Sequence, residues 1–128
     1  ARVWRKRLGG GMRQVGILAA AGLHALDHHL ARLADDHVRA RRLAERVAAA
    51  APGVVDLHAV ETNIVVLRVP DAAALVAACH ERGLLIGALD ATHARLLTHL
   101  DVCDDDVEQA TEILVGLLTS HETAQVRR

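Results

Sequence analysis

The chain has 128 residues, of which 52% are hydrophobic and 24% charged, a balance typical of one globular domain or of part of a larger one. Fifteen basic and sixteen acidic residues give a net charge of −1, and Trp4 is the only aromatic residue. These values argue against a dedicated nucleic-acid-binding protein, which needs a broad basic surface or aromatic platforms for base stacking.

Two cysteines are too few for a disulfide scaffold and indicate a reducing, cytoplasmic location. The longest apolar stretch, residues 15–23, is about half as long as a membrane span, so we expect no membrane partner. The chain begins without Met in a basic, helix-like run, and we therefore expect it to be a piece of a longer protein.

The first fifty residues predict helices. The glycine triplet Gly9-Gly10-Gly11 interrupts the basic head, and from Met12 small and apolar residues recur at steps of three and four as far as Leu33. The pattern continues to residue 50, where Pro52 and Gly53 stop it. Because this stretch is longer than a usual globular helix, we predict two helices with a break near residues 28–31.

The second half predicts strands at residues 54–60, 63–69, 84–88 and 95–100, from short β-branched and apolar runs. It also predicts a helix at 71–82, capped by Asp71 and ended by Gly83, and another at 105–119, which begins with acidic residues. We expect an α+β fold in which helical residues 1–50 lead into a small domain, residues 51–120, with helices on one face of an antiparallel sheet. We expect residues 121–128 to form a tail.

Nine histidines and two cysteines invite a metal or thiol interpretation. His24 and His28 lie four residues apart, with His29 and His37 nearby, but neither an H-E-x-x-H pattern nor a close cysteine pair is present, so we predict no metal site. Cys79 is predicted to be a core residue. Cys103 precedes three aspartates, which oppose a reactive thiolate, so we predict no catalytic cysteine.

The basic head offers a candidate anion site. Basic residues and no acidic ones surround the glycine triplet: Arg2, Arg5, Lys6, Arg7 and Arg13. Glycines before a helix N-terminus leave free N–H groups that can bind an anion, although the spacing of a Walker A loop is missing. A solvated basic turn explains the same pattern, and the sequence leaves both interpretations open.

Arg95 is a more specific candidate for an anion-binding residue. In a strand, Arg95, Leu97 and His99 point to one face, whereas Leu96, Thr98 and Leu100 point to the other. An arginine on the inner side of a sheet needs an anionic partner, and a carboxylate matches its two parallel N–H groups. The alternative is a structural ion pair with an acidic residue of the same chain.

Four stretches together resemble the L-threonine aldolases, pyridoxal-phosphate enzymes of the aspartate-aminotransferase fold that are grouped with the β-eliminating lyases. Residues 5–14 are similar to the signature R-K-x-x-G-G-G-M-R-Q, and the helix at 16–23, with its continuation to His37, agrees as well. Residues 62–65 match T-N-[IM]-V, and residues 95–102 match R-x-V-T-H-x-D-V except for Leu97. The resemblance covers residues 2–118 in order.

The resemblance implies that Arg95 holds the α-carboxylate of an amino-acid substrate and that Lys6 and Arg13 lie near the cofactor pocket. It also implies a homotetramer with shared active sites, and cleavage of L-threonine or L-allo-threonine to glycine and acetaldehyde. In the family the lysine that carries pyridoxal phosphate lies upstream of the glycine triplet, and Lys6, the only lysine here, occupies a different position. We therefore expect the chain to be the C-terminal small domain of such an enzyme and to be inactive on its own.

Two other interpretations remain open at this point. The same fold could serve a β-eliminating lyase acting on another amino acid, which would release ammonia and a keto acid instead of acetaldehyde. Alternatively, the chain could be a free-standing α+β dimerisation or ligand-sensing module, in which case a start codon would lie near Ala1.

Overall fold

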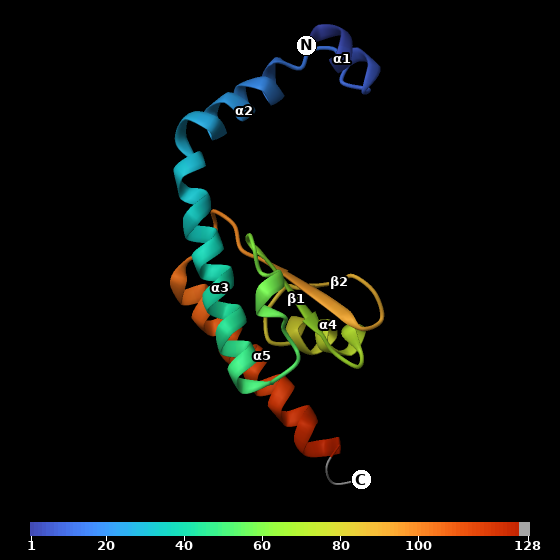
Figure 1. Ribbon diagram of the computed structural model, residues 1–128, viewed down its shortest axis with the longest axis vertical. Helices are drawn as coiled ribbons and strands as arrows, with labels where there is room; N and C mark the ends of the chain where they lie inside the picture. Colours follow the sequence, from blue (N-terminus) through green and yellow to red (C-terminus); the bar gives the residue numbers. More distant parts are fainter. Residues whose placement is uncertain (126–128) are drawn as a thin grey trace. The chain divides into compact units, whose positions relative to one another are not determined.

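The computed structural model describes residues 1–125, with side chains as far as Ser120. The chain divides into two compact units between Arg32 and Leu33, and each unit is described by itself (Figure 1).

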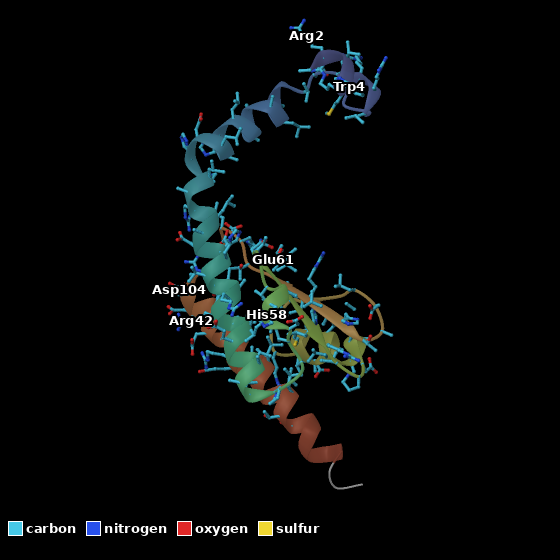
Figure 2. All side chains as sticks on the ribbon, in the orientation of Figure 1. Arg2, Trp4, Arg42, His58, Glu61 and Asp104 are labelled. Atoms are coloured by element: carbon cyan, nitrogen blue, oxygen red, sulfur yellow. The ribbon has the colours of Figure 1, made fainter. Side chains whose placement is uncertain are left out.

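The first unit is helical and has no core of its own. It contains α1 (Arg2–Arg7), α2 (Gly16–His28) and the 3-10 turn η1 (Leu30–Arg32), none of which has a buried residue. The break predicted near residues 28–31 is confirmed, because α2 ends at His28. Ile17 is 84% exposed and Leu23 62%, so the apolar stripe of this helix has no partner within its unit. Trp4 is also exposed (Figure 2).

The glycine triplet ends α1 and does not open α2, contrary to the geometry assumed for an anion site. The N–H groups of Gly9 and Gly10 donate to the carbonyl groups of Lys6 and Arg5, so neither is free for a ligand. Gly9 has a φ of +82°, and a Cβ on Gly10 would lie 2.8 Å from Cγ of Arg5. The glycines therefore allow the loop to fold back over α1, which side chains would prevent.

The second unit is the α+β domain, as predicted. Its three-stranded sheet has the order β1-β3-β2, from β1 (Ile64–Arg68), β2 (Gly87–Ala88) and β3 (His93–Leu97), and both pairings are antiparallel. Three helices accompany it: α3 (Leu33–Ala50), α4 (Ala72–His80) and α5 (Asp104–Gln125). In Figure 1, α3 and α5 run side by side next to the sheet, in agreement with their extensive mutual contacts.

The core lies on one face of this sheet. Val65 and Leu67 of β1 and Ala94 and Leu96 of β3 are buried, and the residues between them are exposed or partly exposed. The buried side chains of the sheet and of the helices form one cluster, in which α3 contacts β1, α4 contacts β2 and β3, and α5 contacts both α3 and α4. The prediction that helices cover one face is confirmed, and α3 joins the two predicted helices there.

The prediction of a strand at residues 54–60 is wrong. This segment forms the 3-10 turn η2 (Leu57–Ala59), because the Asp56 side chain accepts a hydrogen bond of 2.9 Å from the backbone N–H of His58. The segment touches the sheet through a bond from the Arg68 N–H to the Val54 carbonyl, 2.8 Å long. Local side-chain capping thus prevails over the β-branched composition.

The strand predicted at 84–88 shrinks to Gly87–Ala88. The N–H groups of Gly83 and Leu84 donate to the carbonyls of His80 and Cys79, which is the Schellman arrangement at a helix C-terminus. The N–H of Leu84 is therefore consumed by the cap of α4. Asp71 caps the other end of that helix as predicted, accepting from the N–H of Ala74 at 2.9 Å.

The strand predicted at 95–100 instead spans His93–Leu97, and the last helix is longer than expected. α5 begins one residue earlier than predicted and continues to Gln125, so residues 121–125 of the predicted tail are helical. Residues 126–128 lie outside the described part of the chain. Among the described helices, none combines the length and apolarity needed to cross a bilayer.

Candidate functional site

The uncovered face of the sheet, called the open face below, carries the candidate site. It consists of the side chains of Ile64, Val66 and Arg68 on β1 and of His93, Arg95 and Leu97 on β3. The alternation predicted for residues 95–100 is confirmed as far as Thr98, since Leu96 is 6% exposed and Leu97 49%. Leu100, predicted to share the face of Leu96, is exposed in the turn beyond the strand. Antiparallel pairing places Arg68 opposite His93, and Val66 opposite Arg95.

Arg95 lies in the middle of the open face, on the central strand, and it is exposed, so the expected position on the inner side of the sheet is wrong. Its neighbour across β1 is Val66 and its neighbour across β2 is Gly87, neither of which offers a charge. A Cβ on Gly87 would meet nothing within 4 Å, so there is space beside the arginine. Within residues 1–120 no acidic side chain forms an ion pair with Arg95. The structural ion pair considered as an alternative is therefore not formed by the described side chains.

A buried hydroxyl anchors the strand that carries Arg95. Thr98 is 5% exposed, and its hydroxyl donates to the backbone carbonyl of Asp36 at 2.7 Å, which ties β3 to α3. The Asn63 amide donates to the Thr98 carbonyl at 2.6 Å, and the Thr98 N–H donates to the Asn63 carbonyl at 3.0 Å. Two stretches far apart in sequence, 62–65 and 95–102, thus meet and hold the β1–β3 register.

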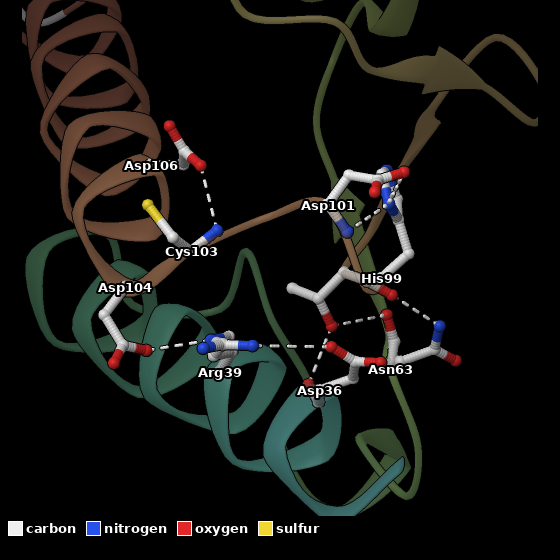
Figure 3. Close-up of polar contacts among 9 residues, drawn as sticks. Asp36, Arg39, Asn63, His99, Asp101, Cys103, Asp104 and Asp106 are labelled. Atoms are coloured by element: carbon white, nitrogen blue, oxygen red, sulfur yellow. Dashed lines mark hydrogen bonds and ion pairs between the residues drawn. The ribbon is translucent and has the colours of Figure 1, made fainter. Parts of the chain in front are cut away.

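The residues after Thr98 form the turn that starts α5. His99 Nδ1 accepts from the N–H of Asp101 at 3.3 Å, and the Cys103 N–H donates to the Asp106 carboxylate at 2.9 Å (Figure 3). The Cys103–Asp106 contact is the reciprocal half of a capping box, and it lowers the pKa of the Asp106 carboxyl. His99 and Cys103 therefore serve the chain path here.

Ion pairs join α3 to α5 beside this turn. Arg39 Nε donates to Asp104 at 2.8 Å, and Nη1 of the same guanidinium lies 3.7 Å from Asp36 (Figure 3). Arg42, labelled in Figure 2, and Arg46 both contact Glu108. The hydrogen bond from Arg39 lowers the pKa of the Asp104 carboxyl. These arginines have acidic partners, which distinguishes them from Arg95.

The other predicted site residues, Lys6 and Arg13, belong to the first unit. The Lys6 side chain lies along the loop, with Nζ 3.3 Å from the position that a Cβ on Gly11 would occupy. Arg13 is exposed between the glycines and α2. Arg7 lies over the Trp4 ring, 5.3 Å from its centroid, a cation–π contact within α1.

The histidines expected to be neighbours, His24, His28 and His29, lie close together at the C-terminal end of α2. His24 and His28 have ring centroids 4.3 Å apart, and His24 and His29 5.2 Å. Within the described residues, no group of three or more His, Cys, Asp or Glu side chains is arranged to hold a metal ion. Cys79 is buried in the core, as predicted, and burial raises the pKa of its thiol.

Sequence reasoning missed Arg68 and His93 as neighbours of Arg95. His93 Nδ1 lies 2.9 and 3.0 Å from the two carboxylate oxygens of Asp90. The Thr92 N–H and His93 together lower the pKa of the Asp90 carboxyl to about 2. The period-two pattern of residues 64, 66 and 68 indicated that Arg68 shares a face with Val66, but only the strand register brings it beside residues 93 and 95.

Comparison with known proteins relates the chain to enzymes. It is 44% identical over 108 residues to the low specificity L-threonine aldolase of Escherichia coli, an alignment that covers 83% of this chain and 31% of the enzyme. It is 42% identical over 113 residues to the probable low-specificity L-threonine aldolase 2 of Arabidopsis thaliana, covering 84% and 32%. The chain thus spans about a third of the length of these curated relatives.

A family profile matches as well. The profile described as Beta-eliminating lyase aligns with residues 1–72, which include the basic head, the glycine triplet, α2, α3 and β1. The match extends over more than half of the sequence and crosses both units. The chain therefore belongs to the beta-eliminating lyase family.

Proposed function

We propose that the chain is the C-terminal part of an aldolase that cleaves L-threonine or L-allo-threonine to glycine and acetaldehyde, with Arg95 binding the substrate carboxylate. The names of the relatives support the reaction. The observation that carries the role of Arg95 is its position: an arginine on the central strand, between Val66 and Gly87, with no acidic partner among residues 1–120. A second observation is the space beside Gly87.

The chemistry of the guanidinium suits this role. Two parallel N–H groups can donate to both carboxylate oxygens, which fixes the plane of the carboxylate and so the orientation of the bonds at Cα. A charge-assisted hydrogen bond contributes roughly 1.5–3 kcal/mol, and most of its value for catalysis is positional. The Thr98–Asn63–Asp36 contacts hold β3 in place and so position the arginine.

Pyridoxal phosphate, the cofactor that the resemblance implies, fits the described residues only in part. The basic loop offers cationic side chains suited to a phosphate. Lys6, however, lies on a six-residue helix against Gly11, and the N–H groups of Gly9 and Gly10 are occupied by backbone bonds. These residues do not form a complete cofactor site. We therefore assign no reaction step to Lys6 and expect the 128-residue chain alone, supplied with pyridoxal phosphate, to release no acetaldehyde from threonine.

The test is kinetic and uses the full-length gene product that contains this chain. Arg95→Ala is expected to lower kcat/KM for L-threonine by about one to two orders of magnitude, the equivalent of one lost charge-assisted contact. Arg95→Lys should recover little, because a point charge cannot reproduce the fork of the guanidinium. Arg82→Ala, an exposed arginine just beyond α4, is the control. If both Arg95 variants cleave threonine at near-normal rates but have a much lower Tm, the arginine stabilises the fold and does not bind the carboxylate.

The family description favours a second candidate, β-elimination on another amino acid. Product analysis of the same preparation separates the two reactions, because the aldolase releases acetaldehyde and the eliminating enzyme releases ammonia and a keto acid. Light scattering and cell fractionation test two further proposals from the resemblance, a homotetramer and a cytoplasmic location.

A further inference from the structure

A hollow lies at the basic end of the open face, beside Arg68 and His93. Its volume is about 430 Å³, within the range of small-molecule sites. The aliphatic part of its wall comes from Val66 and from Val54, Val55, Ala59 and Val60 in the loop that contains η2. Three polar side chains complete the lining: Asp56, Arg68 and His93. Arg95 does not line this hollow, although it lies on the same face.

Arg68 enters the hollow with its charge uncompensated. Its backbone N–H donates to the Val54 carbonyl at 2.8 Å, which fixes the arginine beside the loop. Its guanidinium forms no ion pair or hydrogen bond with any side chain of residues 1–120. It is therefore available to a carboxylate.

Asp56 brings the opposite charge to the same hollow. One carboxylate oxygen accepts from the N–H of His58 at 2.9 Å, which caps η2 and fixes the side chain. Asp56 and Arg68 form no ion pair with each other although both line the hollow. The Asp56 carboxylate is thus held by a backbone contact, and the unpaired guanidinium of Arg68 lines the same hollow among aliphatic side chains.

His93 is the third polar group, and its orientation is fixed from outside the hollow. Nδ1 faces the Asp90 carboxylate at 2.9 Å and donates to it, which leaves Nε2 as the ring atom free to meet a ligand. Strand pairing sets the histidine opposite Arg68. An acidic and a basic group beside a further polar ring suit a ligand that carries both charges.

We propose that this hollow binds a free α-amino acid with an aliphatic side chain, at a site separate from the carboxylate contact assigned to Arg95. Arg68 binds the carboxylate, Asp56 binds the ammonium group, and the valines receive the side chain. A simple anion would leave Asp56 without an ion-pair partner, and an amine would leave Arg68 without one. A zwitterion can pair with both residues at once. The site does not depend on the proposed aldolase activity.

The experiment is a titration of the 128-residue chain with L-valine, followed by backbone amide NMR shifts and calorimetry. We expect saturable shifts in residues 53–60 and at His93. 3-Methylbutanoate, which lacks the amine, and isobutylamine, which lacks the carboxylate, should each bind at least about tenfold more weakly, because each loses one charge-assisted contact.

Matched variants locate the site. Arg68→Gln and Asp56→Asn should each weaken L-valine binding by about 10- to 100-fold. The asparagine keeps an oxygen that can cap η2, so the loop should retain its fold. Arg82→Gln should leave binding unchanged, because Arg82 does not line the hollow.

Three results would overturn the proposal. The first is the absence of saturable shifts, and the second is equal binding of L-valine and either analogue. The third is loss of binding in Arg95→Gln, which would place the amino acid at the Arg95 contact. Failure of the aldolase proposal is distinguishable, because it appears in the kinetics of Arg95 variants and leaves the effects of Arg68→Gln and Asp56→Asn on valine binding intact.

Discussion

Leu96 and Leu97 are adjacent on β3 and provide a matched test of the one-sided core. Leu96 is 6% exposed and points toward the helices, whereas Leu97 is 49% exposed on the open face. Truncating a buried leucine to alanine costs about 2–5 kcal/mol, because the lost transfer free energy is joined by the cost of a cavity. The half-exposed Leu97 leaves no enclosed cavity, and its truncation should cost about 1 kcal/mol or less.

Urea unfolding followed by far-UV circular dichroism measures both values. Trp4 is a poor probe, because it lies in the first unit and is 62% exposed. With an m value of about 1–1.5 kcal/mol per molar urea for a domain of this size, Leu96→Ala should lower the midpoint by at least about 1.3 M and Leu97→Ala by less than about 1 M. Equal losses at an unchanged m value would show that the open face is covered in solution and would refute the one-sided core.

Two further predictions concern the first unit and the loop before β3. Deleting residues 1–32 removes no buried residue, so the free energy of unfolding of the remainder should change by less than about 0.5 kcal/mol. Light scattering should show reduced self-association, because the exposed apolar stripe of α2 is lost. A deletion product that does not fold would contradict this prediction. The folded pKa of Asp90, about 2, lies below its ordinary 3.8, so its contribution to stability is present above about pH 4 and is lost as the pH falls toward 2. Asp90→Asn should therefore make the loss of stability over that interval shallower in acid titrations, and an unchanged slope would show that the Thr92 and His93 contacts do not persist in solution.

The local chemistry of the sequence was sufficient where one residue decides a backbone conformation. Asp71 and Gly83 begin and end α4 as predicted, and the break after His28 separates two helices. The same logic, applied to Asp56, would have identified η2, because its carboxylate caps the turn. The β-branched run at 54–60 instead suggested a strand, since composition alone does not show which hydrogen bonds the backbone will make.

The candidate site was predictable only where a local sequence pattern marks the residue. Arg95 follows from the period-two alternation of its strand and from the resemblance of residues 95–102, and both are properties of adjacent residues. Arg68 and His93 lie 25 positions apart in the sequence, and no local pattern links them. Only the antiparallel register of β1 and β3 sets them opposite each other and beside Arg95.

The sequence by itself thus determined the α+β class, the helix boundaries with strong caps and the family, because these depend on side chains a few residues apart or on motifs read in order. The tertiary structure decided which face of the sheet is covered, that the glycine triplet folds back on α1, and that Asp56 and Arg68 share a hollow without pairing. The physical reason is the range of the interactions. Caps and turns are satisfied within one helical turn, whereas burial and charge pairing depend on strand register and helix packing between segments distant in the chain.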